Sequence, residues 1–115
     1  MKSKIVCPNP DYFFWIGITP FQNDCLAQVS PIYTLRSNGK IKPGRIGVIQ
    51  FHDKDSFTAE IMSHEAVHLA TTYMRLLDEE HLVLSDEIDD NEEHLAWYIG
   101  YFTQKITDYF YKYIN

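Results

Sequence analysis

Two histidines and a glutamate stand near the middle of the chain: His64, then Glu65, two further residues and His68. On an α-helix, residues four apart lie on one face, so both imidazoles can reach a single metal ion. Glu65 is then placed to take a proton from a water molecule at the open side of that metal. The spacing therefore predicts a zinc site formed by His64 and His68, with Glu65 as the general base.

This HExxH pattern works only if a helix surrounds it. By chance alone, a chain of this composition would contain the pattern roughly once in a hundred sequences. Residues 57–77 contain neither glycine nor proline, and Asp53, Asp55 and Ser56 precede them with side chains that can cap a helix. The pattern is therefore predicted to lie in the middle of a helix.

Zinc at a catalytic site usually has three protein ligands and one open position, so the two histidines need a partner. One common solution places a glycine three residues, and a third histidine six residues, after the second histidine. Here those positions hold Thr71 and Met74, which excludes that arrangement. The third ligand must come from another element.

Glu93 is the third ligand that the sequence favours. It shares one face of a second helix with Ala96, Trp97 and Gly100. The small side chains at two of these positions would let this helix pack closely against the HExxH helix and bring the carboxylate within reach of the zinc. Glu92, about 100° away around the helix, is the alternative.

The second helix is expected to begin near Asp89 or Asp90, because Asp90 and Glu93 have the form of a capping box. Apolar residues then follow at spacings of three and four, which predicts a buried stripe. The stripe consists of Leu95, Ile99, Phe102, Ile106, Phe110 and Tyr113. Gly100 predicts the close approach of another backbone, and the acidic residues 78–87 are expected to connect the two helices.

Strand-forming residues dominate the first half of the chain. Residues 12–18 lie between two prolines, and residues 45–51 precede the first helix. Residues 27–35 contain Pro31, which favours either an edge strand or the start of a strand. The sequence therefore predicts a single α+β domain over residues 1–115. In this domain a small, mostly antiparallel sheet packs on two main helices.

The run Glu93-His94-Leu95-Ala96 follows HExxH by about two dozen residues and has the form E-x-x-[Ala/Ser]. With HExxH, it resembles the gluzincin zinc peptidases, and more narrowly the very small metallopeptidase domains of bacteriophage and bacterial genomes. The resemblance covers roughly residues 45–105.

The resemblance implies a minimal zincin-like fold that hydrolyses peptide bonds. It implies Zn²⁺ held by His64, His68 and Glu93, with Glu65 as the base. In thermolysin-like gluzincins the ligand glutamate directly follows an asparagine, a rule that selects Glu92 in this chain. Zincins also hold an extended substrate along the edge strand of the sheet, and the resemblance makes the strand at residues 46–51 the candidate.

Charge and composition restrict the partners. The net charge is -6, and residues 55–115 carry most of the acidic groups whereas residues 1–54 are mainly basic. An acidic excess argues against nucleic-acid binding, and no apolar run approaches the roughly 20 residues needed to cross a membrane. Cys7 and Cys25 form no CxxC pair, which fits a reducing compartment. These observations predict a cytoplasmic protein whose partner is a protein or peptide substrate.

Two functional hypotheses follow. The first is a minimal zinc-dependent peptidase, of the kind that a phage or mobile element would encode, with Glu65 essential for turnover. The second is a catalytically inactive zincin-like binding module, in which zinc is structural and the surface engages a host protein.

Overall fold

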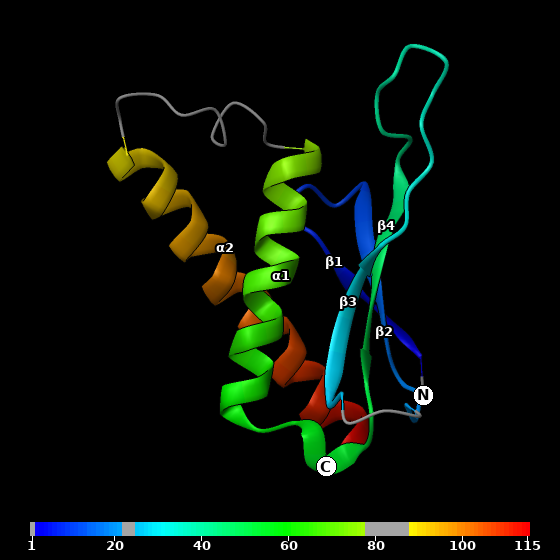
Figure 1. Cartoon of the computed structure of the whole chain (residues 1–115), viewed down its shortest axis with the longest axis vertical. Helices are drawn as coiled ribbons and strands as arrows, with labels where there is room; N and C mark the ends of the chain where they lie inside the picture. Colours follow the sequence, from blue (N-terminus) through cyan, green and yellow to red (C-terminus); the bar gives the residue numbers. More distant parts are fainter. Residues whose placement is uncertain (1, 22–24, 78–87) are drawn as a thin grey trace.

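The computed structural model describes residues 2–21, 25–77 and 88–115 (Figure 1). Four strands come first along the chain and two long helices follow, so the predicted α+β class is confirmed. The elements are β1 Ser3–Val6, β2 Tyr12–Ile18, β3 Ala27–Pro31, β4 Gly44–Phe51, the 3-10 turn η1 Lys54–Ser56, α1 Ala59–Leu77, α2 Ile88–Tyr109 and the π-helical turn η3 Phe110–Ile114.

The strands form one sheet in the order β1-β2-β4-β3. β1 pairs with β2 and β3 with β4 in antiparallel register, whereas β2 and β4 run parallel. The sheet is therefore mixed and mostly antiparallel, as predicted. The strand β1 lies outside the predicted set.

The prediction that residues 46–51 form an edge strand is wrong. β3 and β4 pair as neighbouring antiparallel strands, and β4 also pairs with β2, so β4 has a hydrogen-bonded strand on each side. Within the described sheet, the edges are β1 and β3. Pro31 ends β3, where its missing N–H costs no ladder hydrogen bond, in agreement with the edge position predicted for it.

Both helices lie on the same face of the sheet (Figure 1). The core between the two layers contains Phe14 and Ile49 from the sheet, Leu69 from α1, and Phe102 and Ile106 from α2, all of them fully buried. The rings of Phe14 and Phe102 meet edge to face with centroids 5.7 Å apart, so the second helix packs directly on the strands.

The helix predicted around HExxH is confirmed as α1. The side chain of Thr58 accepts a hydrogen bond from the backbone N–H of Ile61 at 3.2 Å, which satisfies one of the unpaired donors in the first turn. Just before it, Asp53 caps η1 by accepting from the backbone N–H of Ser56. The two histidines therefore lie well inside a capped helix.

The second helix is also confirmed, but it begins at Ile88, so Asp90 lies inside its first turn rather than before it. Of the predicted stripe, Phe102 and Ile106 are fully buried, and Leu95, Ile99 and Phe110 are partly buried against the core. The connection predicted at residues 78–87 lies outside the described residues.

The predicted packing of the small-residue face of α2 is wrong. Ala96, Trp97 and Gly100 are exposed, and a Cβ added at Gly100 would meet no atom within 4 Å. The reason is that the apolar stripe on the other side of the helix buries far more apolar surface, and this stripe sets which face of α2 meets α1.

None of the described helices is both long enough and apolar enough to cross a membrane.

Candidate metal and catalytic site

Helix α1 brings His64 and His68 together on one exposed face. Their ring centroids lie 5.0 Å apart, at an interplanar angle of 73°. The side chain of His64 is 67% exposed, and His68 is exposed too. Two neighbouring imidazoles open to solvent, one turn apart, form half of the donor set of a typical zinc site.

Glu65 differs sharply from the two histidines, because it is buried, with 5% of its surface exposed. Its Oε1 lies 3.9 Å from Nε2 of His64. Its Oε2 is buried without a hydrogen-bond partner among the described residues. Burial raises the pKa of the Glu65 carboxyl, while positive charge on His68 and His64 lowers it.

A carboxylate with a raised pKa and one unsatisfied oxygen has the properties of a general base. Its pKa lies closer to neutral pH than that of an exposed glutamate. The unsatisfied oxygen can accept a proton or a hydrogen bond from a ligand. The predicted roles of His64, His68 and Glu65 are therefore compatible with their positions.

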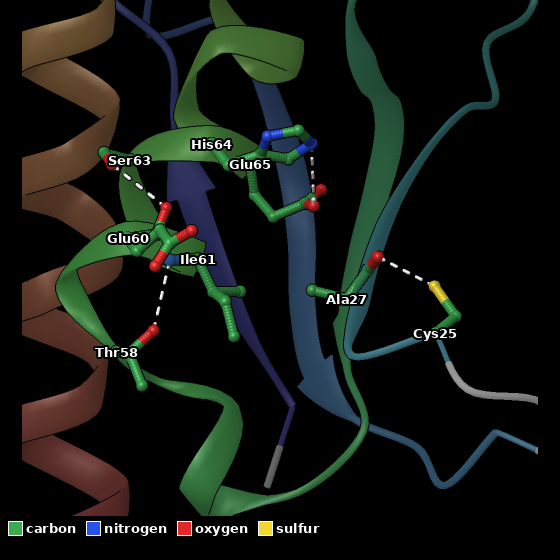
Figure 2. A network of polar contacts seen from close by, with 8 residues as sticks. All are labelled: Cys25, Ala27, Thr58, Glu60, Ile61, Ser63, His64 and Glu65. Carbon is green, nitrogen blue, oxygen red and sulfur yellow. Dashed lines mark hydrogen bonds and ion pairs between the residues drawn. The ribbon is translucent and has the colours of Figure 1, made fainter.

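A hollow of about 320 Å³ adjoins this group. It lies between α1 and the start of the edge strand β3, and Figure 2 shows His64 and Glu65 on the side of α1 that faces Ala27. Leu26, Ala27 and Ile61 supply apolar walls, and Glu60 and the site residues supply polar ones. The hollow gives a ligand access to Glu65 from the edge of the sheet.

Sequence reasoning missed the residues of this wall. Glu60 could have been found, because it lies four residues before His64 and therefore on the same helix face. It cannot join both histidines on one metal, since residues 60 and 68 are eight apart, about 12 Å along the axis. Leu26 and Ala27 carried no signal, because their position depends on how β3 pairs.

Glu93 lies far from the histidines. The ring of Tyr73 in α1 contacts that of Tyr98 in α2, with centroids 5.1 Å apart. Because the helices run in opposite directions (Figure 1), His68 and Glu93 lie on opposite sides of this contact, each five residues from it. At 1.5 Å per residue, about 15 Å separates them along the helix axes.

The side chain of Glu93 is exposed, as is that of Glu92. The two helices also diverge toward the end where α2 begins (Figure 1). In residues 2–21, 25–77 and 88–115, no three His, Cys, Asp or Glu side chains are grouped so that they could hold a metal ion. The structure therefore brings together His64, His68 and Glu65 but not Glu93, whose role as a ligand stays a prediction.

Other polar side chains near the core have structural partners. His52 accepts a hydrogen bond at Nδ1 from the backbone N–H of Phe21 at 2.7 Å. Tyr73 accepts from the backbone N–H of Asn9 at 3.0 Å, and Tyr101 donates to the carbonyl of Val6 at 2.7 Å. These contacts hold loops and strand ends in place, away from HExxH.

A larger hollow, of about 710 Å³, lies between the loop after β3 and the carboxyl end of α1, where Tyr12, Arg36 and Leu76 contribute to its lining. It contains no residue of HExxH. Size alone therefore does not identify the site, and the chemistry points to the smaller hollow beside Glu65.

Comparison with known proteins adds no relative: no family model, no curated protein and no solved structure matches the chain. The functional argument therefore depends on the residues and their geometry.

Proposed function

We propose that this protein is a zinc-dependent peptidase in which His64 and His68 bind the metal and Glu65 acts as the general base. The observation that carries the proposal is the buried carboxyl of Glu65, with Oε2 unsatisfied, beside two exposed imidazoles on one helix face. A buried carboxylate oxygen with no hydrogen-bond partner among the described residues lowers stability, so its presence calls for a role in chemistry.

The zinc, when bound, would act as a Lewis acid that lowers the pKa of a water molecule and polarises a substrate carbonyl. The chain provides the proton transfers. Glu65 accepts the proton of the attacking water as a general base. The same carboxyl, now protonated, then acts as a general acid and delivers the proton to the leaving amine. The apolar wall at Leu26 and Ala27 limits competing water around the reacting groups.

The edge strand β3 offers the place for a peptide substrate. Its backbone pairs with β4 on one side only within the described sheet, so an extended peptide can add to the other side through main-chain hydrogen bonds. Ala27 of this strand lines the same hollow as Glu65, which would bring the scissile bond next to the base.

The binding-module hypothesis receives less support from the arrangement. A structural zinc would have to join α1 to another element, yet His64 and His68, the two ligands that lie together, belong to one helix. The helices already hold together through apolar contacts such as those of Leu69 and Phe102. A metal bound at one helix face adds no cross-link.

Glu93 remains the third ligand that the sequence predicts, and the cytoplasmic location predicted from the cysteines goes with the proposal. Neither cysteine forms a disulfide in the structure.

Two measurements test the proposal together. Elemental analysis of protein purified without chelators should give close to one zinc per chain, with strong loss in His64→Ala. Loss in Glu93→Ala as well is expected only if α2 shifts toward the histidines when the metal binds. Hydrolysis of a pool of quenched fluorescent peptides should then depend on zinc and disappear in Glu65→Gln, which should still bind zinc.

Glu60→Gln is the matched control, because it removes an exposed carboxylate from the same helix face and should leave zinc content unchanged. Loss of zinc in His64→Ala but not in Glu93→Ala would place the third ligand elsewhere. A folded, zinc-loaded parent that cleaves no peptide, or unchanged cleavage by Glu65→Gln, would refute the peptidase proposal.

A further inference from the structure

The face of the sheet that points away from α1 and α2 has an unusual composition. Side chains alternate along a strand, so with Phe14 and Ile16 buried in the core, Phe13 and Trp15 project from the opposite face. We call this the outer face. In the register, Lys4 lies opposite Trp15 on β1.

Positive charge on the outer face is concentrated around the two aromatic rings. The Nζ of Lys2 lies 4.4 Å from the Trp15 ring centroid, and the Nζ of Lys4 lies 4.4 Å from that of Phe13. The two rings meet edge to face, 5.2 Å apart. Arg45 pairs with Phe13 in the register and adds a third cation. None of the four strands contains an acidic residue.

The outer face is also hollowed. A depression of about 330 Å³ is lined in part by Lys2, Trp15, Gly17, Arg45 and Gln50. Gly17 keeps its floor open, since a Cβ added there would meet only the Cα of Lys2, at 3.9 Å. The depression suits a flat, apolar group joined to an anion. The indole of Trp15 forms a wall for the flat group, and Lys2 and Arg45 offer positive charge to the anion.

We propose that the outer face binds single-stranded DNA, with a base stacked against Trp15 and neighbouring phosphates paired with Lys2, Lys4 and Arg45. Single-strand binding surfaces combine aromatic side chains, on which bases stack, with cations that follow the backbone. The overall charge of -6 predicted no nucleic-acid partner. That total, however, adds the acidic helical half to a sheet whose strands carry no acidic residue.

The same observations disfavour other occupants. A membrane-binding surface presents apolar side chains that protrude into lipid, whereas here Phe13 and Trp15 are half-buried and Trp15 lines a depression. An acidic peptide would pair with the cations but would not use the indole wall. Duplex DNA keeps its bases stacked inside, out of reach of Trp15.

We take DNA as the ligand because the outer face offers few groups that could recognise a ribose hydroxyl, so nothing in it calls for RNA. The side chains of Gln28 and Gln50 hydrogen-bond to each other at 3.3 Å, which uses polar groups that would otherwise be available. The 2′-hydroxyl is what lets a protein distinguish RNA from DNA at a site. This surface has no evident reader for it.

The number of cations fixes the expected salt dependence. Each phosphate neutralised on a single strand contributes about -0.7 to the slope of log K against log salt concentration, so three contacts predict a slope of about -2. This value is small enough to distinguish the outer face from an extended basic channel.

The experiment is a fluorescence-anisotropy titration of a labelled 12-nucleotide oligothymidine with the full chain, at several salt concentrations. The parent should bind with a slope of about -2. Trp15→Ala should weaken binding by roughly tenfold or more, because loss of one stacked base has an effect of that order. Gly17→Val should also weaken it, since it fills the depression while leaving every charge in place.

Two variants on the helical side serve as matched controls. Trp97→Ala removes an exposed indole from α2, and Lys105→Glu removes a cation that likewise lies over an aromatic ring, 5.3 Å from the Tyr101 centroid. Both should bind the oligonucleotide like the parent, whereas Lys4→Glu should not. With Trp97→Phe, Trp15 is the sole tryptophan, so its quenching by the oligonucleotide reports stacking directly.

Circular dichroism confirms that each variant is folded before its affinity is compared. Lack of binding by the parent at low salt would overturn the proposal, as would parent-like binding by both Trp15→Ala and Gly17→Val. Equal or tighter binding of a duplex or of polyglutamate would overturn it too. Glu65→Gln should bind like the parent, so the result is independent of whether the protein is a peptidase.

Discussion

Replacement of Glu65 by glutamine should make the metal-free protein more stable. In the parent, a carboxylate at pH 8 is buried, and one of its oxygens has no hydrogen-bond partner in the part of the chain that the structure describes. Glutamine keeps the shape but carries no charge. A buried charged group without a partner costs roughly 1–3 kcal/mol or more, and the amide retains part of this cost, so the expected gain is about 1–2 kcal/mol. For a domain of this size, that is a rise in Tm of about 4–8 °C.

The gain should depend on pH in a defined direction. Burial raises the pKa of Glu65 in the folded state above its ordinary value of 4.5, so the folded parent loses stability as the pH rises from there through the folded pKa. The glutamine variant lacks this loss. The two proteins should therefore be equally stable at pH 4 or below, and the difference should open as the pH rises. Positive charge on His68 and His64 favours the ionised carboxyl and therefore makes the difference smaller.

Thermal unfolding in the presence of a chelator, followed by circular dichroism between pH 4 and 8, measures this difference. Glu60→Gln is the control, because its side chain is exposed and its effect should stay within about 0.5 kcal/mol. A Glu65→Gln variant that is equal to or less stable than the parent at pH 8 would show that the carboxylate is not held at an energetic cost. Higher stability combined with lost turnover is the pattern expected of a residue retained for chemistry.

Three further predictions concern the metal, the glycines and the thiols. Zinc should stabilise the chelator-treated parent by about 2.7 kcal/mol at a concentration 100 times its Kd, and a His68→Ala variant with an undiminished thermal shift would contradict the ligand assignment. Gly47→Ala should cost about 3 kcal/mol, because its Cβ would lie 2.8 Å from a buried ring and 2.9 Å from a carbonyl oxygen. Gly100→Ala, with open space around the new Cβ, should instead raise the free energy of unfolding by about 1 kcal/mol. Urea denaturation measures both variants, and a Gly47→Ala protein more stable than Gly100→Ala would contradict the close packing at Gly47. Burial raises the pKa of the Cys7 thiol to about 12, so iodoacetamide at pH 8 should label only the half-exposed Cys25 in the native protein, and two labels by mass spectrometry would contradict this.

The elements that the sequence predicted best are those with local determinants. Residues 12–18 match β2 from end to end, because β-forming side chains between two prolines leave the backbone little choice. The helix around HExxH is set by side chains such as Thr58 and Asp53 in the preceding turn. β1 was not predicted, because its four residues carry too weak a pattern by themselves. Its pairing with β2 stabilises it.

The position of β4 could not be read from local pattern, because the order of strands is decided by long-range pairing. The resemblance to zincins made the strand just before α1 the candidate for the edge. Instead, β3 pairs with β4 on the side opposite β2, so β3 is the edge strand. The consequence is functional, since Ala27 of β3, rather than a residue of β4, lines the hollow next to Glu65.

The third ligand was predicted from two assumptions that the same helix cannot satisfy together. The apolar stripe was expected to be buried, and the face of Glu93 was expected to meet α1. Glu93 and Phe102 are nine residues apart, which at 100° per residue places them about half a turn from each other. Burying a phenylalanine contributes roughly 1.5–3 kcal/mol, and Ile106 adds to the same side, whereas Ala96 and Gly100 offer little apolar surface. The apolar stripe is therefore the face of α2 that is buried, and Glu93 is exposed to solvent. A zinc content that falls in Glu93→Ala would mean that α2 rotates or shifts when metal binds, at the expense of this apolar packing.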